Sequence, residues 1–139
     1  MDGTMKHFLI VAVALLYGCS EANDNARKLD LSSVNGLVDL QKEVGGNWER
    51  VCIFGPYSTN SVAAGVLGFE WDLELKSSVF TSDDISLLVF TASDKVVSFF
   101  EVSRGDADFS ELSRQCFRPS DSKFRIHRSQ SGWPEVEKA

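Results

Sequence analysis

The chain has 139 residues, enough for one domain, and its hydrophobic fraction of 43% and charged fraction of 24% are ordinary for a soluble globular protein. This composition excludes an integral membrane protein and a disordered chain. The net charge of −6 and the isoelectric point near 4.8 argue against a nucleic-acid partner, because an acidic surface repels phosphate groups.

The N-terminus has the pattern of an export signal. Lys6 and His7 precede a nine-residue apolar run, residues 8–16, which is too short for a transmembrane helix of about 20 residues. The alternative is a buried core helix, which the position at the start of the chain disfavours. An acid, Asp2, precedes the basic residues, so the sequence leaves open whether Met1 or Met5 is the true start, and Met5 gives the cleaner signal.

The apolar run ends in Leu16-Tyr17-Gly18-Cys19. These residues resemble the lipobox of bacterial lipoproteins, in which a small residue precedes the cysteine. The resemblance implies that the Cys19 thiol is alkylated with diacylglycerol and that a peptidase removes residues 1–18. Tyr17 departs from the small or β-branched residue usual at its position. The resemblance covers only the first twenty or so residues, and the remaining chain is similar only in outline to small uncharacterised envelope lipoproteins.

The lipoprotein resemblance also implies a location. Lipoproteins carry two or three acyl chains, which hold a protein on a membrane, so the membrane is the expected partner through the N-terminal lipid. In enterobacterial sorting an Asp after the cysteine favours the inner membrane. Ser20 therefore implies the periplasmic face of the outer membrane. Residues 19–28 are polar beyond Cys19 and are predicted to form a flexible tether.

The first half of the predicted domain, residues 29–128, alternates between helix and strand patterns. Residues 29–44 have apolar side chains at helical spacing, with Ser32 or Ser33 as a cap and Gly45-Gly46 as a stop, so they predict a helix. A strand at 48–54, a turn at 55–58 and a short helix at 61–67 follow. Residues 69–76 alternate apolar and polar side chains and predict a strand with one buried face.

The second half predicts the centre of a sheet. Residues 85–91 and 95–103 are nearly continuous apolar runs around a turn at 92–94, so they predict strands covered on both faces. Asp106 or Asp108 can cap a short helix at 109–115, which carries Cys116 towards Cys52. Residues 124–128 predict an edge strand, and 129–139 a frayed C-terminal tail. The predicted fold is α+β: a mainly antiparallel meander of four or five strands, an N-terminal helix, one or two short helices and one disulfide.

Cysteine pairing follows from export. Lipid on Cys19 leaves Cys52 and Cys116, and an oxidising compartment favours one disulfide between them. The rival hypothesis is a catalytic thiol with His127 as its base, but the neighbouring residues do not indicate an activated thiolate. One histidine and two distant cysteines are too few ligands for a metal, and no cofactor motif is present, so we predict no metal and no cofactor.

The loop at 55–60 is the most distinctive candidate binding site, because Tyr57 and Asn60 offer hydrogen-bonding groups beside an aromatic ring. The alternative is an ordinary turn in which Tyr57 packs on its edge. Trp71 is expected in the core, Trp48 in the core or at its rim, and Trp133 either docks on the domain or contacts a partner. Five cations form either a patch for anionic headgroups or a solubilising surface: Arg114, Arg118, Lys123, Arg125 and Arg128.

Three functional hypotheses remain at the level of the sequence. The first is a non-catalytic, membrane-anchored binding or accessory module of the cell envelope, whose partner is an envelope protein or a cell-wall component. The second is a small envelope hydrolase or thiol enzyme without a recognisable motif. The third is an immunity or inhibitor-type lipoprotein. We predict no catalytic residue, because no nucleophile or metal-ligand motif is found.

Overall fold

The structure is a computed structural model that describes residues 25–128 and 132–139. The predicted signal peptide, residues 1–18, and the predicted lipidation site, Cys19, lie outside the described residues. Within those two ranges, no helix has the length and apolar character needed to cross a bilayer.

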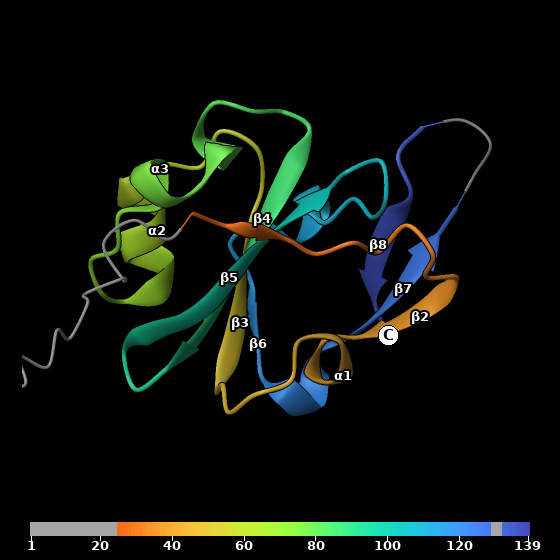
Figure 1. The fold of residues 1–139 in the computed structure, drawn as a ribbon, viewed down its shortest axis with the longest axis horizontal. Helices are drawn as coiled ribbons and strands as arrows, with labels where there is room; N and C mark the ends of the chain where they lie inside the picture. Colours follow the sequence, from red (N-terminus) through yellow and green to blue (C-terminus); the bar gives the residue numbers. More distant parts are fainter. Residues whose placement is uncertain (1–24, 129–131) are drawn as a thin grey trace, which may run out of the picture.

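The described strands form two sheets (Figure 1). The five-stranded sheet has the order β1 (Arg27–Lys28), β5 (Lys95–Ser103), β4 (Ile85–Ala92), β3 (Arg50–Phe54) and β6 (Cys116–Phe117). The three-stranded sheet has the order β2 (Gly36–Asp39), β7 (Lys123–His127) and β8 (Glu135–Lys138). Among the described strands β1 runs parallel to β5, and the other neighbours are antiparallel.

The helices are short. They are α1 (Leu40–Val44), α2 (Asn60–Leu67) and α3 (Leu73–Lys76). Single 3-10 turns follow later in the chain, at Ser78–Phe80, Ser110–Leu112 and Pro119–Asp121. In α2 the Thr59 side chain accepts a hydrogen bond from the Val62 N–H, and Gly68 ends the helix with a φ of 83°. The predicted short helix at 61–67 is therefore confirmed.

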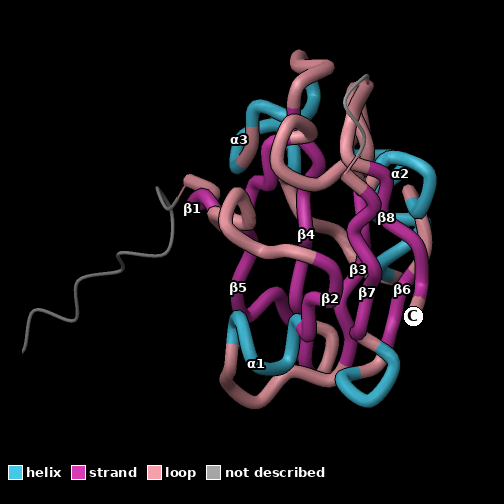
Figure 2. The backbone as a smooth tube through the Cα atoms, turned by 90° about the vertical axis from the view of Figure 1, so that its right-hand side faces the viewer, coloured by secondary structure: helices cyan, strands magenta, loops and turns pink. Residues whose placement is uncertain are grey.

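The five-stranded sheet is the middle layer of the molecule, and Figure 2 shows its strands β5, β4 and β3 running side by side. Alternate side chains of β4 enter two separate cores. Leu88 and Phe90 pack with residues of the three-stranded sheet such as Phe124, whereas Leu87 and Val89 pack with residues of α2 and α3. The prediction of a strand covered on both faces is confirmed for β4. In β5 the side chains are mostly half-buried, because this strand lies next to the two-residue edge strand β1.

The predicted α+β class and the mainly antiparallel pairing are confirmed, but the predicted single meander of four or five strands is wrong. Strands β3, β4 and β5 do form a meander, with the predicted turn between β4 and β5. The described residues contain eight strands in two sheets. The additional strands are β2, from the predicted helix, β1, from the predicted tether, β8, from the predicted tail, and β6, from a segment for which no element is predicted.

The predicted N-terminal helix at 29–44 is wrong except for its last five residues. Gly36 has a φ of 90°, and the next residues pair with β7 as β2, so that Val38 is buried and Leu37 is exposed. The helix begins only after Asp39, whose carboxylate accepts a hydrogen bond from the Gln41 N–H. Gly45 ends it, as predicted.

The predicted strand at 69–76 is also wrong. Asp72 accepts a hydrogen bond from the Leu75 N–H and so begins α3, in which Leu73 is buried and Leu75 is exposed. The predicted helix at 109–115 is reduced to the single turn Ser110–Leu112, because Arg114, with a φ of 70°, turns the chain into β6.

The two predicted flexible ends are wrong where the structure describes them. Within the predicted tether, Arg27–Lys28 pairs with β5, and the Ala26 N–H donates to the Lys76 carbonyl at 2.9 Å. Within the predicted frayed tail, Glu135–Lys138 pairs with β7 as β8. The predicted edge strand at 124–128 is consequently the central strand of the smaller sheet.

Candidate functional site

The two cysteines of the domain meet as predicted. Cys52 on β3 and Cys116 on β6 are directly opposite in the antiparallel register, and their sulfur atoms lie 2.08 Å apart, a bonding distance. Cys52 is buried and Cys116 is half-buried. The predicted alternative partner, His127, lies on the other sheet, where its Nε2 is 2.6 Å from the Glu137 carboxylate. Neither sulfur is therefore a free thiol in this structure.

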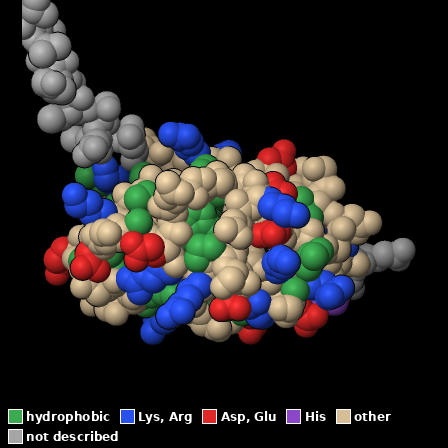
Figure 3. Space-filling view, turned by 90° about the horizontal axis from the view of Figure 1, so that it is seen from below, with side chains coloured by type: hydrophobic (Ala, Val, Ile, Leu, Met, Phe, Trp, Pro, Cys, Tyr) green, Lys and Arg blue, Asp and Glu red, His purple; other side chains and the backbone are tan. Residues whose placement is uncertain are grey.

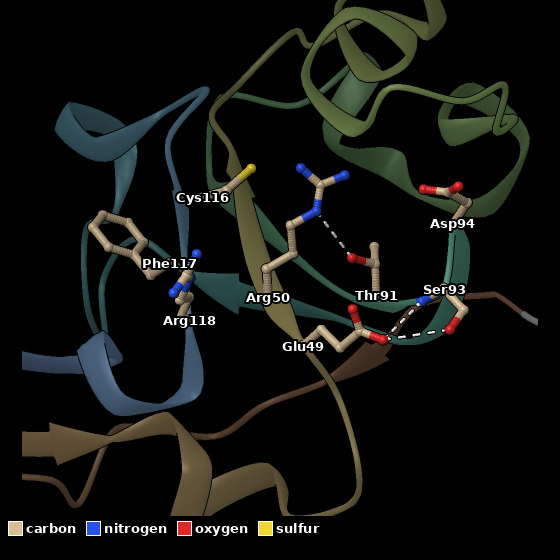
Figure 4. A pocket seen from close by; sticks show the side chains of 8 residues that line it. All are labelled: Glu49, Arg50, Thr91, Ser93, Asp94, Cys116, Phe117 and Arg118. Atoms are coloured by element: carbon tan, nitrogen blue, oxygen red, sulfur yellow. Dashed lines mark hydrogen bonds between the residues drawn. The ribbon is translucent and has the colours of Figure 1, made fainter.

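A pocket of about 540 Å³ opens beside this cysteine pair (Figure 4). We call it the hairpin pocket, because it lies between the start of β3, the turn joining β4 to β5, and β6. Its lining residues supply two cations, two carboxylates, two hydroxyls, an aromatic ring and a half-buried cysteine: Glu49, Arg50, Thr91, Ser93, Asp94, Cys116, Phe117 and Arg118.

Hydrogen bonds fix several of these side chains in place. The Arg50 guanidinium donates to the Thr91 hydroxyl at 3.3 Å and to the Leu67 carbonyl. The Glu49 carboxylate accepts from the backbone N–H of Ser93 at 3.2 Å. Ser93 and Asp94 have φ angles of 50° and 58°, which make the tight turn that Figure 4 shows above Glu49. The pocket is thus preformed on a rigid hairpin, as expected for a binding site.

The chemistry of the hairpin pocket suits binding of a polar ligand. Charges of both signs face one opening, and the Phe117 ring adds an apolar surface. Among the eight lining residues, neither serine nor threonine has a histidine beside it, and Cys116 is bonded to Cys52. The Ser93 hydroxyl donates instead to the Glu49 carboxylate, at 3.4 Å.

The two residues singled out in the predicted binding loop at 55–60, Tyr57 and Asn60, have different environments in the structure. Tyr57 is exposed, with a φ of 62°, and its N–H donates to the Val79 carbonyl at 2.8 Å. Asn60 joins two helices: its side-chain N–H donates to Asp72 at 3.1 Å, and its side-chain oxygen accepts from the Glu74 N–H at 2.9 Å. The Asn60 amide is therefore used to hold α2 against α3, whereas the Tyr57 ring remains open to a partner.

The five basic residues do not form one uniform patch. Arg114 and Arg118 flank β6, whereas Lys123 and Arg125 lie on β7 opposite carboxylate-bearing residues of β2 and β8. The Arg128 guanidinium donates to the carbonyls of Leu31 and Val34 at 3.0 and 2.8 Å, which ties the N-terminal loop to the end of β7. Only part of the predicted patch thus remains open for anionic headgroups.

A partly buried ion pair, which no sequence motif predicts, holds the C-terminal segment. Arg104 donates two hydrogen bonds to Asp108, at 3.0 and 3.2 Å, and the Trp133 ring stacks on Arg104 at 4.7 Å. Burial raises the pKa of Asp108, but hydrogen bonds from Arg104 and Ser110 outweigh it and leave the pKa below its ordinary value. The spacing of four residues between the two charges was the available signal. Trp133 therefore docks on the domain.

The other two tryptophans occupy the cores. Trp48 is buried and meets the Phe90 ring edge to face at 4.9 Å. Trp71 is half-buried and meets Phe99 at 5.1 Å, as predicted for a core residue. In residues 25–128 and 132–139, no group of three or more His, Cys, Asp or Glu side chains could hold a metal ion.

No family model, curated protein or solved structure matches the chain.

Proposed function

We propose that the protein is a lipid-anchored module of the bacterial cell envelope that acts by binding. Cys19 carries the lipid, residues 1–18 are removed, and the domain lies on the periplasmic side of the membrane, with Ser20 directing it to the outer membrane. The hairpin pocket is its binding surface, and an envelope protein or a cell-wall component is its partner.

The bonded pair Cys52–Cys116 carries the proposal. A disulfide persists in an oxidising compartment and is rare in the bacterial cytosol. The pairing of Cys52 with Cys116, which are 64 positions apart in the sequence, therefore supports export. Export also explains the basic residues and the apolar run at the N-terminus, which together form a signal peptide. A cysteine directly after Gly18 fits the signal peptide of a lipoprotein better than one that is cleaved without lipidation.

The hairpin pocket supports binding over catalysis. Two of its charged side chains are held in place: the Arg50 guanidinium donates to the Thr91 hydroxyl and to the Leu67 carbonyl, and the Glu49 carboxylate accepts from the Ser93 N–H. A zwitterionic segment such as a peptide, with one carboxylate near Arg118 and one amine near Asp94 or Glu49, matches the charges of the lining residues.

Labelling with radioactive palmitate tests the anchor. Cells that express the wild-type chain should incorporate label into this protein, and Cys19→Ala should abolish it. Ser20→Ala is the matched control, since it changes the neighbouring residue and keeps the thiol. Label in the Cys19→Ala protein, or none in the wild type, would contradict the proposal.

Photo-crosslinking in intact cells tests the binding surface. A photoreactive residue in place of Ser93, on the exposed rim of the hairpin pocket, should capture a reproducible partner. The same residue in place of Lys42, exposed on α1, is the control. Equal capture at both positions, or none at 93, counts against the pocket.

A further inference from the structure

Exposed apolar side chains gather near the point where the described chain begins. Leu75 on α3 is 66% exposed, Phe80 is 36% exposed and Tyr57 is 60% exposed. We call these three residues the proximal surface. Tyr57 belongs with the other two because its N–H bonds to the carbonyl of Val79, directly before Phe80.

Backbone contacts connect this surface to the start of the described chain. Asn25 and Ala26 line a cavity of about 350 Å³ together with Leu75, and the Ala26 N–H donates to the Lys76 carbonyl at 2.9 Å. Figures 1 and 2 both show α3 beside this start, while Figure 1 shows β2 at the opposite end of the long axis. Figure 3 shows Lys and Arg side chains at the same end, with Asp and Glu side chains beside them.

The cations of β1 lie on one side of the proximal surface. Arg27 and Lys28 on β1 are exposed. The carboxylate nearest to α3 on the sheet, Glu101, accepts hydrogen bonds from the hydroxyls of Ser77 and Ser78, both at 3.0 Å, and is thereby occupied. Asp72 and Glu74, at the start of α3, accept hydrogen bonds from the backbone N–H groups of Leu75 and Asn60. Two further acids, Asp83 and Asp84, follow Phe80. The basic side of the surface therefore lies at Arg27 and Lys28.

Chain length fixes how far this end can move from the anchor. Asn25 is the sixth residue after Cys19. Six residues span at most about 20 Å when fully extended, and a flexible chain of that length averages about 12–15 Å. A lipid on Cys19 therefore keeps α3 and β1 within reach of the headgroup layer, whichever way the domain turns.

We propose that the proximal surface rests on the lipid headgroups of the membrane that holds Cys19. Leu75 and Phe80 insert between headgroups, and Arg27 binds lipid phosphate, as amphipathic surfaces with basic flanks do. The inference rests on the proposed anchor. It gives the anchored domain an orientation, with the three-stranded sheet facing away from the bilayer.

An environment-sensitive fluorophore can report this contact. The native cysteines are bonded or lipidated, so Leu75→Cys provides one reactive thiol for an NBD label, and Phe80→Cys provides a second position. Leu37→Cys is the matched control, because Leu37 is 52% exposed on β2 at the far end. Each lipidated, full-length mature protein is reconstituted into vesicles of phosphatidylethanolamine and phosphatidylglycerol that contain brominated lipid.

The expected result is a blue-shifted emission and loss of fluorescence at positions 75 and 80, with neither change at 37. Equal quenching at all positions, or none at any position in protein that carries lipid, would overturn the orientation and leave the anchor intact. A blue shift at 75 that grows with protein concentration in the absence of lipid would assign the surface to a second copy of the chain. Absence of lipid on Cys19 by mass would overturn the anchor, and the orientation with it.

Discussion

Reduction of the Cys52–Cys116 pair should destabilise the domain strongly. The two residues are 64 positions apart, and in the chain-entropy model a loop of about 65 residues restricts the unfolded chain by about 4 kcal/mol. Native domains of this size are stable by about 5–15 kcal/mol, so the bond contributes a large share of the total. With a urea slope of about 2 kcal/mol per molar, the unfolding midpoint should fall by about 2 M.

Urea unfolding followed by tryptophan fluorescence measures this effect, since Trp48 is buried against Phe90. The mature chain with Cys19→Ser is compared with and without dithiothreitol. The double variant Cys52→Ala/Cys116→Ala is the control, because its midpoint should not respond to the reductant. Midpoints that agree within about 0.5 M for the oxidised and reduced chain would refute the reasoning.

Three further predictions concern side chains whose roles the structure defines. Asn60→Ala should lower the free energy of unfolding by about 1–3 kcal/mol, because the N–H of Glu74 loses its acceptor. Tyr57→Gly should raise it by up to about 1 kcal/mol, because glycine relieves a φ of 62°. A urea midpoint that is higher for Asn60→Ala than for Tyr57→Gly would be inconsistent with these roles. Asp108→Asn should cost about 1.5–3 kcal/mol near neutral pH, because two hydrogen bonds from Arg104 lose their charged acceptor. The pKa of Asp108 is lowered by folding, so its contribution is present above the unfolded value of about 3.9 and is lost as the pH falls through the folded value. The stability difference between wild type and Asp108→Asn should therefore narrow as the solution is acidified below the unfolded value, and a constant difference would contradict the assignment. Arg128→Ala should speed amide hydrogen exchange of the N-terminal loop, since the carbonyls of Leu31 and Val34 lose their donor, whereas exchange in β4 should stay unchanged; equal effects in both segments would indicate global destabilisation.

The centre of the fold was predictable because its pattern is unambiguous. Strands β4 and β5 are nearly continuous apolar runs around a polar turn, which predicts their pairing as a hairpin; burial on both faces holds for β4, whereas β5 is mostly half-buried. The pairing of Cys52 with Cys116 followed from the number of cysteines once Cys19 was assigned to lipid.

The predictions were wrong where a short apolar pattern fits both the helical period of 3.6 residues and the strand period of two residues. Residues 69–76 alternate like a strand, yet Asp72 supplies a helix cap and Asn60 bonds to the first turn of α3, so local capping decided the structure. In the segment 29–44, Leu37, Leu40 and Val44 fit a helix, but Gly36 takes a left-handed φ and the strand partner β7 lies far along the chain. Such long-range pairing leaves no signal in a local window.

The candidate site was only partly predictable for the same reason. The hairpin pocket brings together Glu49, Asp94 and Arg118, which are far apart in the sequence and have no common motif. Composition alone indicates the loop at 55–60 as a binding site. Composition cannot show that the Asn60 side chain is hydrogen-bonded to Asp72 and Glu74.

The most direct test of the central claim is the mass of the N-terminal peptide of the protein purified from bacterial membranes. Trypsin should release a peptide that begins at Cys19 and ends at Arg27, with the mass of the nine residues plus diacylglycerol on the sulfur, with or without a further acyl group on the new amino terminus. A peptide that retains Gly18, or one that begins at Cys19 with an unmodified thiol, would contradict the anchor.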